Sequence, residues 1–244
     1  MCLKKFYVLL FLFLTACADD GYKLKDLTEA IRIGDYHLVE IIIDSKQVNL
    51  EPEPEPYKIN KPLAYAVQVG NLDIIKLLID RGADINGKVA YGDMPFTIAA
   101  QTFNQKQRFE IMKYLIEQGA DMNTPNAFGI NGFMGLCAMN KLELLKLVIN
   151  KVEDVNAQFE AVSNDGTKLN YNALQFAVSG KHYDVVKFLL AHGADPSIKT
   201  ADGKDSFLLA AEKGYKEIYN LMRGTEGEKR PVDVTKTIPQ KLEK

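Results

Sequence analysis

Groups that perform catalysis or bind metal ions are scarce in this sequence. Its 244 residues include three cysteines and three histidines, His37, His182 and His192. His182 and His192 stand ten residues apart with no cysteine pair beside them, which is not the ligand spacing of a zinc site. The sequence therefore predicts no metal and no cofactor.

Motifs for nucleophilic chemistry and phosphate binding are missing too. No serine stands in a Gly-x-Ser-x-Gly setting, and Gly132-Phe133-Met134-Gly135 lacks the Lys-Ser/Thr that completes a phosphate-binding loop. Asp202-x-x-Asp205 does not match a calcium-binding loop. Because no nucleophile is paired with a base, we predict that the protein is not an enzyme.

Neither sign of charge dominates. The chain has 30 Lys and Arg residues against 32 Asp and Glu residues, which gives a formal net charge of -2 at pH 7. A protein that mainly binds nucleic acid needs a basic stripe or patch. The balance therefore argues against nucleic acid as a partner.

What the sequence does contain is a recurring pair of apolar segments. In residues 62–86 the first segment carries Leu63 and Ala66, and the second has apolar residues at helical spacing from Ile74 to Leu78. The pattern predicts two helices joined at Gly70-Asn71, with Gly82 as the left-handed residue that ends the second. Helices of about ten residues are marginal in water. Neighbouring copies must therefore cover their apolar faces.

Copies of this unit follow one another along the chain. A small residue between the two helices marks them, with separations of 36, 33, 38, 40 and 33 residues: Ala30, Ala66, Ala99, Cys137, Ala177 and Ala210. The clearest copies end alike, in Gly82-Ala83-Asp84, Gly119-Ala120-Asp121 and Gly193-Ala194-Asp195. A period near 33 with these features resembles the ankyrin repeat, from about Leu27 to Arg223. The resemblance implies an all-α solenoid of about six helix-turn-helix repeats with β-hairpin fingers.

The same pattern sets the expected boundaries. We predict an ankyrin-repeat domain at residues 24–223, with repeats near 24–50, 61–86, 94–123, 132–156, 172–198 and 205–223. The first and last repeats should act as caps, because each has a neighbour on one side only. Residues 224–244 are expected to form a mobile polar tail.

Two connections between repeats stand out. Residues 51–56 alternate Glu and Pro, which favours a stiff, exposed insertion, although an acidic docking strand is the alternative. Residues 158–172 form the longest connection, and Asn164-Asp165-Gly166 supplies a hairpin turn. The resemblance implies an extended finger there.

The start of the chain resembles a bacterial lipoprotein signal peptide. Lys4 and Lys5 precede nine apolar residues, and Leu14-Thr15-Ala16-Cys17 has the order of a lipobox. The apolar run is far short of the roughly 20 residues that cross a bilayer. The resemblance implies a signal peptide at residues 1–16, lipidation of Cys17 and a tether at 17–23. An ordinary cleaved signal peptide is the alternative.

This resemblance also implies a place in the cell. The protein would be lipid-anchored in the bacterial envelope and face the periplasm, and Ala18 in place of Asp after Cys17 favours the outer membrane over the inner. With Cys2 removed and Cys17 lipidated, Cys137 is left unpaired, and we expect a small buried hydrophobe there. We expect a monomer.

A protein partner is expected on the concave finger surface, which consists of the fingers and the exposed sides of the first helices. Four aromatic residues fall in finger segments: Tyr91, Phe128, Phe159 and Tyr171. The exposed first-helix positions carry a mostly polar set: Gln68, Thr97, Gln101, Met139, Gln175 and Ser179. Aromatic residues often anchor recognition. The alternative is that each aromatic packs on the adjacent finger. Other aromatic residues match core positions of the repeat: Tyr65, Phe96, Phe133, Phe176 and Phe207.

The sequence leaves three functions open. The first is a protein-binding lipoprotein that acts as an immunity or inhibitor protein against a periplasmic toxin or an envelope enzyme. The second is a structural envelope lipoprotein attached to peptidoglycan through Lys244. The third is a hydrolase that uses His182 or His192, and the missing nucleophile makes it the weakest.

Overall fold

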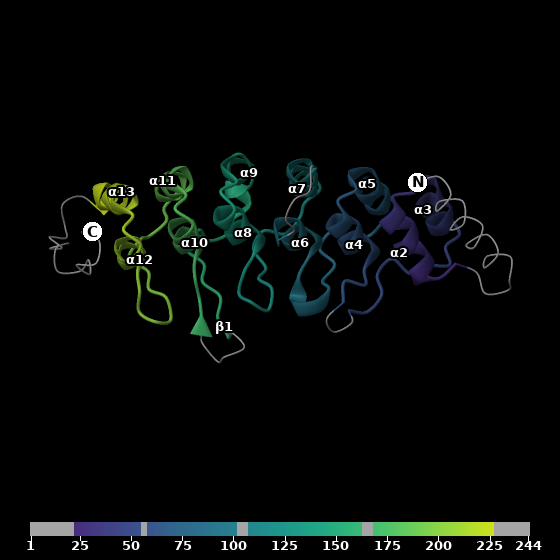
Figure 1. Ribbon diagram of the computed structural model, residues 1–244, viewed down its shortest axis with the longest axis horizontal. Helices are drawn as coiled ribbons and strands as arrows, with labels where there is room; N and C mark the ends of the chain where they lie inside the picture. Colours follow the sequence, from purple (N-terminus) through teal and green to yellow (C-terminus); the bar gives the residue numbers. More distant parts are fainter. Residues whose placement is uncertain (1–21, 55–57, 102–106, 163–167, 227–244) are drawn as a thin grey trace, which may run out of the picture. The chain divides into compact units, whose positions relative to one another are not determined.

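The computed structural model describes residues 22–54, 58–101, 107–162 and 168–226. The chain divides into two compact units, residues 1–120 and residues 121–244. Each unit contains three pairs of antiparallel helices in its described part (Figure 1). The expected fold of stacked helix pairs is confirmed.

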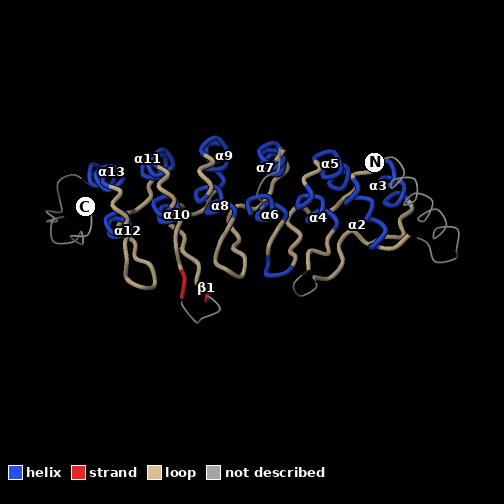
Figure 2. Tube along the Cα trace, in the orientation of Figure 1, coloured by secondary structure: helices blue, strands red, loops and turns tan. Residues whose placement is uncertain are grey.

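In the first unit each pair consists of two short helices, and the first helices of successive pairs pack side by side. The pairs are α2 (Leu24–Ile33) with α3 (Tyr36–Asp44), α4 (Pro62–Val69) with α5 (Leu72–Asp80), and α6 (Pro95–Gln101) with α7 (Arg108–Glu117). The connections between pairs project as fingers from the side of the first helices (Figure 2).

The second unit repeats this arrangement. Its pairs are α8 (Gly132–Ala138) with α9 (Leu142–Val148) and the 3-10 turn η2 (Ile149–Lys151), α10 (Ala173–Ser179) with α11 (Tyr183–Ala191), and α12 (Ser206–Glu212) with α13 (Lys216–Glu226). Helix α13 continues past Arg223, so part of the segment expected to be a polar tail is helical. Residues 227–244 lie outside the described part of the chain.

Side chains before the helices fix where they begin. The side-chain oxygen of Asn71 accepts a hydrogen bond from the Ile74 N–H at 3.2 Å, and Asn131 caps α8 in the same way through the Met134 N–H at 2.9 Å. Such caps satisfy donors that the helix leaves unpaired. Gly82 has φ +87, which confirms the left-handed residue predicted after α5.

The core consists of the small residues between the helices and the aliphatic residues around them. All six marker residues are buried: Ala30, Ala66, Ala99, Cys137, Ala177 and Ala210. A small side chain there lets two helices and the next repeat approach closely. Phe96, Phe133 and Phe207 are buried as predicted. Tyr65 and Phe176 are only half-buried, which corrects that prediction. The smaller Ile98 and Leu209 are buried at the same repeat position, so a large ring there leaves part of its surface exposed.

Two asparagine side chains in the second unit, Asn123 and Asn156, each bond the backbone of the next connection. The Asn156 Nδ2 donates to the Gly193 carbonyl at 3.0 Å, and its Oδ1 accepts from the Asp195 N–H at 2.8 Å. Asn123 bonds the Lys151 carbonyl and the Glu153 N–H in the same manner, each at 3.1 Å. The fourth repeat thus keeps this link although it lacks Gly-Ala-Asp.

The Glu-Pro segment is attached at its base, which corrects the picture of a fully exposed insertion. Glu51 forms an ion pair with Lys61 at 2.7 Å and accepts the Asp84 N–H at 2.9 Å. Asn60 donates to the Glu53 carbonyl at 2.6 Å. Glu51 therefore takes the bridging role that asparagine has in later repeats. Residues 55–57 lie outside the described part of the chain.

The longest finger contains the expected hairpin. Strands β1 (Ala161–Val162) and β2 (Lys168–Leu169) pair antiparallel, and the predicted turn at 164–166 lies outside the described residues. In the described part of the chain the other fingers have no strand pairing, which corrects the expectation of hairpins throughout. Three of them, at 89–93, 126–130 and 200–204, close through a backbone hydrogen bond from the first residue of the turn to the fifth. No helix in the described ranges is long and apolar enough to cross a membrane.

The asparagine link can be tested by substitution. We expect Asn156→Ala to lower the free energy of unfolding by about 1–2 kcal/mol, because two hydrogen bonds to the next connection are lost. Urea unfolding followed by circular dichroism measures this. Asn150→Ala in η2, at an exposed position, is the control and should change stability by less than about 0.5 kcal/mol. Equal losses in the two variants would contradict the link.

Candidate protein-binding surface

The finger surface of the first unit carries one exposed aromatic residue at the end of a turn. Tyr91 is 48% exposed and lies in the 3-10 turn η1 (Ala90–Gly92), at the far end of the finger that precedes α6 (Figure 2). The Val89 N–H donates to the Asp93 carbonyl at 2.8 Å and closes the turn. The ring is thus carried by a closed turn at the end of the finger.

The first helices of this unit contribute fewer exposed side chains to the finger surface than expected. Gln68 is exposed near the end of α4, as predicted. Thr97 is only 3% exposed, because its Oγ1 accepts the Met94 N–H at 2.8 Å and turns back into the start of α6. The expected exposure of Thr97 is therefore wrong. The side chain of Gln101 lies outside what the structure describes.

In the second unit the predicted aromatic residues differ in exposure. Phe128 is 46% exposed in the turn 126–130. Phe159 and Tyr171 flank the hairpin and are half-buried. The Tyr171 ring lies 5.6 Å from that of Phe176 on α10, so it packs at least in part on its own repeat. Met139, after α8, is half-buried.

Gln175 does not belong to this surface. It is 0% exposed, which makes its predicted exposure wrong. Its Oε1 accepts the Asn172 N–H at 2.9 Å, and its Nε2 donates to the Ile198 carbonyl at 2.8 Å. The side chain therefore caps α10 and holds the following finger at the same time.

A second clamp, which sequence reasoning missed, holds that finger to the hairpin. The Gln158 Nε2 donates to the Asn170 carbonyl at 2.7 Å and to the Lys199 carbonyl at 3.0 Å. The Asn170 Oδ1 accepts the Ala201 N–H. Gln158 precedes β1 and Asn170 directly follows β2, and amide side chains on both sides of the predicted turn were the available signal. The bases of both fingers are thus fixed before any partner binds.

The candidate catalytic groups have structural partners. The His182 Nε2 lies 2.9 Å from the Ala138 carbonyl and the His192 Nδ1 lies 2.7 Å from the Phe188 carbonyl. Cys137 is fully buried, and burial raises the pKa of its thiol far above the usual range. Within the described residues, no group of three or more His, Cys, Asp and Glu side chains could hold a metal ion.

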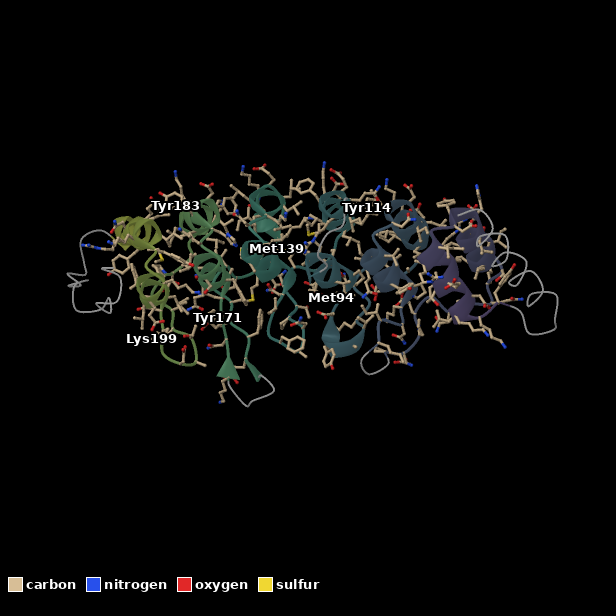
Figure 3. The ribbon with its side chains drawn as sticks, viewed as in Figure 1. Met94, Tyr114, Met139, Tyr171, Tyr183 and Lys199 are labelled. Carbon is tan, nitrogen blue, oxygen red and sulfur yellow. The ribbon has the colours of Figure 1, made fainter. Side chains whose placement is uncertain are left out.

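Large apolar side chains are also exposed away from the fingers, on the second helices. In the first unit these are Tyr36, Ile41 and Phe109, and in the second they are Leu147 and Tyr183. Tyr183 lies on α11, on the side opposite Tyr171 (Figure 3). Beside Ile41, Arg81 forms ion pairs with Glu40 at 3.4 Å and Asp44 at 3.0 Å, and these pairs raise the pKa of the Arg81 guanidinium.

Comparison with protein families gives one clear match. A family model described as ankyrin repeats in three copies matches residues 27–126, 96–200 and 133–231. Among solved structures, the ankyrin repeat protein EF0377 has a TM-score of 0.67 and 30% identity, with 83% of this chain and 98% of that chain covered. An ankyrin repeat domain from Acinetobacter baumannii AYE has a TM-score of 0.65 and 25% identity, with coverage of 82% and 97%.

Curated relatives match over a small part of their own length. The Caenorhabditis elegans "ankyrin repeat and KH domain-containing protein mask-1" is 27% identical over 200 residues, which is 82% of this chain and 6% of that protein. The human "NAD-capped RNA hydrolase NUDT12" is 28% identical over 92 residues, 38% of this chain and 20% of that protein. The activities in these names belong to those proteins.

Gln68 and Gln175 were both predicted to be exposed on first helices, but substitution of these two glutamines should affect stability differently. We expect Gln175→Ala to lower the free energy of unfolding by about 2–3 kcal/mol, because it leaves the Asn172 N–H and the Ile198 carbonyl without their partner. Gln68→Ala, at an exposed site, should stay within about 0.5 kcal/mol of the wild type. Thermal and urea unfolding of both variants measure this, and a Gln175→Ala variant as stable as the wild type would refute the clamp.

Proposed function

The chain belongs to the ankyrin-repeat family, and from that premise we propose that it is a non-enzymatic lipoprotein of the bacterial envelope whose finger surface binds another protein. Ankyrin repeats form a protein-interaction scaffold in which each pair of helices supports a projecting connection. The chemistry of this chain is consistent with binding rather than turnover, since His182 and His192 bond backbone carbonyls and the thiol of Cys137 is buried.

The observation that carries the binding proposal is the exposure of aromatic rings at the finger turns. Tyr91 and Phe128 are open to solvent, although most aromatic residues at repeat core positions are buried. Rings on short turns lose few degrees of freedom on binding and supply large contact areas, as interface anchors do. In the second unit, the clamps at Gln158, Asn170 and Gln175 hold the finger bases in place, so little ordering is needed on association.

The anchoring part of the proposal rests on the first residues. Cys17 lies outside the described part of the chain, and the support is the order Leu14-Thr15-Ala16-Cys17 after a basic start and an apolar run. We propose that the lipid on Cys17 holds the protein at the periplasmic side of the outer membrane rather than the inner, and that it acts there as a monomer. A tethered scaffold with elaborated fingers suits an immunity or inhibitor protein against a toxin or an envelope enzyme.

Partner binding should depend on the fingers and not on the outer helices. We expect Phe128→Ala to reduce capture of the partner from an extract of the native cells by about tenfold, because an aromatic anchor commonly contributes more than about 1 kcal/mol. Tyr183→Ala is the matched control, since Tyr183 is also exposed but lies on α11. Quantitative mass spectrometry of the captured proteins gives the result. If the wild type captures no specific protein, the binding proposal fails.

Lipid attachment has its own test. We expect cells that express the chain to incorporate labelled palmitate into it, and Cys17→Ser to abolish both this label and recovery in the membrane fraction. Cys2→Ser is the control, because Cys2 lies within the leader and should leave labelling intact. Label that persists in Cys17→Ser, or is missing from the wild type, would rule out the lipoprotein assignment.

A further inference from the structure

Three fingers of this chain reverse through the same five-residue turn. The first residue donates its N–H to the carbonyl of the fifth, and the fourth, a glycine, donates its N–H to the carbonyl of the first. The distances are 2.8 and 3.0 Å in turn 89–93, 3.0 and 3.0 Å in turn 126–130, and 2.8 and 2.9 Å in turn 200–204. The glycines Gly92, Gly129 and Gly203 have φ of +72, +68 and +81. The three turns have the same hydrogen bonds, so their backbone conformations can be compared directly.

Turn 89–93 differs from the other two at its third residue. Tyr91 has φ +59 and ψ +15, a left-handed conformation that an aromatic residue adopts at a cost. Among the described residues, the non-glycine residues with positive φ are Lys46, Tyr91, Asn140 and Lys181, so Phe128 and Asp202 do not share this conformation. The same pair of closing hydrogen bonds thus forms without the strain elsewhere in the chain.

The first residue of each turn explains the difference. The Asn126 Oδ1 accepts the Phe128 N–H at 3.0 Å and the Ile130 N–H at 3.1 Å. The Thr200 Oγ1 accepts the Lys204 N–H at 3.1 Å. Val89 has no side-chain acceptor, and in its turn the Asp93 N–H instead donates to the Ala90 carbonyl at 3.3 Å. Valine at this position therefore favours rotation of the backbone at Tyr91, which redirects the ring.

We propose that turn 89–93 is a recognition device, in which Val89 holds the backbone in a strained conformation that directs Tyr91 into a recess on the protein partner. The proposal rests on the proposed binding function and deepens it. Tyr91 is large, exposed and at the end of a projecting finger, so the matching surface is a concave one that takes a phenol ring. The partner must present an apolar recess with a polar group near its floor, because the tyrosine hydroxyl has to stay hydrogen-bonded.

The strain is tested first, without any partner. Asparagine tolerates the left-handed region, so Tyr91→Asn should shift the unfolding equilibrium constant toward the native state by about fivefold or more. Phe128→Asn, at the same place in an unstrained turn, should give no such gain. In a Val89→Thr background, which supplies the acceptor that Thr200 provides, the gain from Tyr91→Asn should disappear. Urea unfolding of the four variants measures these shifts, and equal effects of Tyr91→Asn and Phe128→Asn would overturn the proposal.

The second test asks whether the direction of the ring matters. Val89→Thr keeps the Tyr91 side chain but relaxes its backbone, and it should reduce capture of the partner from native-cell extract by about tenfold. Tyr91→Ala should reduce capture as much, and the double variant should reduce it no further. If Val89→Thr captures as well as the wild type, the recognition device is refuted while protein binding stands. If the wild type itself captures nothing, the proposed function falls with it.

Discussion

Mutual covering of short helices is the constraint on which the rest of this structure depends. Helices of seven to eleven residues do not hold together alone, and within each unit they bury their apolar sides against their own partner and a neighbouring pair. The small residue between the helices of a pair permits the close approach, which is why alanine or cysteine recurs there. Cys137 occupies this place, and its role is packing. Because the core is formed by apolar residues of the helices, the connections between pairs can differ in length and sequence without disturbing it.

The connections are nevertheless held at their bases. Side chains from one repeat bond the backbone of the next connection, as Asn156 does with Gly193 and Asp195, and as Glu51 does with Asp84. Such bonds satisfy backbone groups that a projecting loop would otherwise leave to water. At the ends of the fingers, turn chemistry then decides the direction of the backbone that carries each exposed side chain.

The helix pairs, their caps and the left-handed Gly82 could be predicted from the sequence, because these features depend on residues within one repeat. Gln175 and Thr97 could not be placed in this way. We expected both positions to face solvent, but Ala64 at the same repeat position of α4 is also fully buried. The partner of Gln175 is a carbonyl 23 residues further on, which only the packed structure brings near. Glu51 was misjudged for the same reason, since its partners Lys61 and Asp84 belong to other segments.

Exposure alone does not separate a binding residue from an ordinary surface residue in this chain. Ile41 on α3, at 54%, is more exposed than Tyr91, yet it stands among charged side chains that form ion pairs around Arg81, and single exposed apolar residues need no function. Tyr91 differs because its position is also unfavourable for its backbone, while two sister turns show that the chain can close the same loop without strain. An aromatic residue that is both exposed and strained is a candidate for a role other than folding. The left-handed backbone at Tyr91 therefore gives the finger end, rather than the outer helices, the stronger claim to recognition.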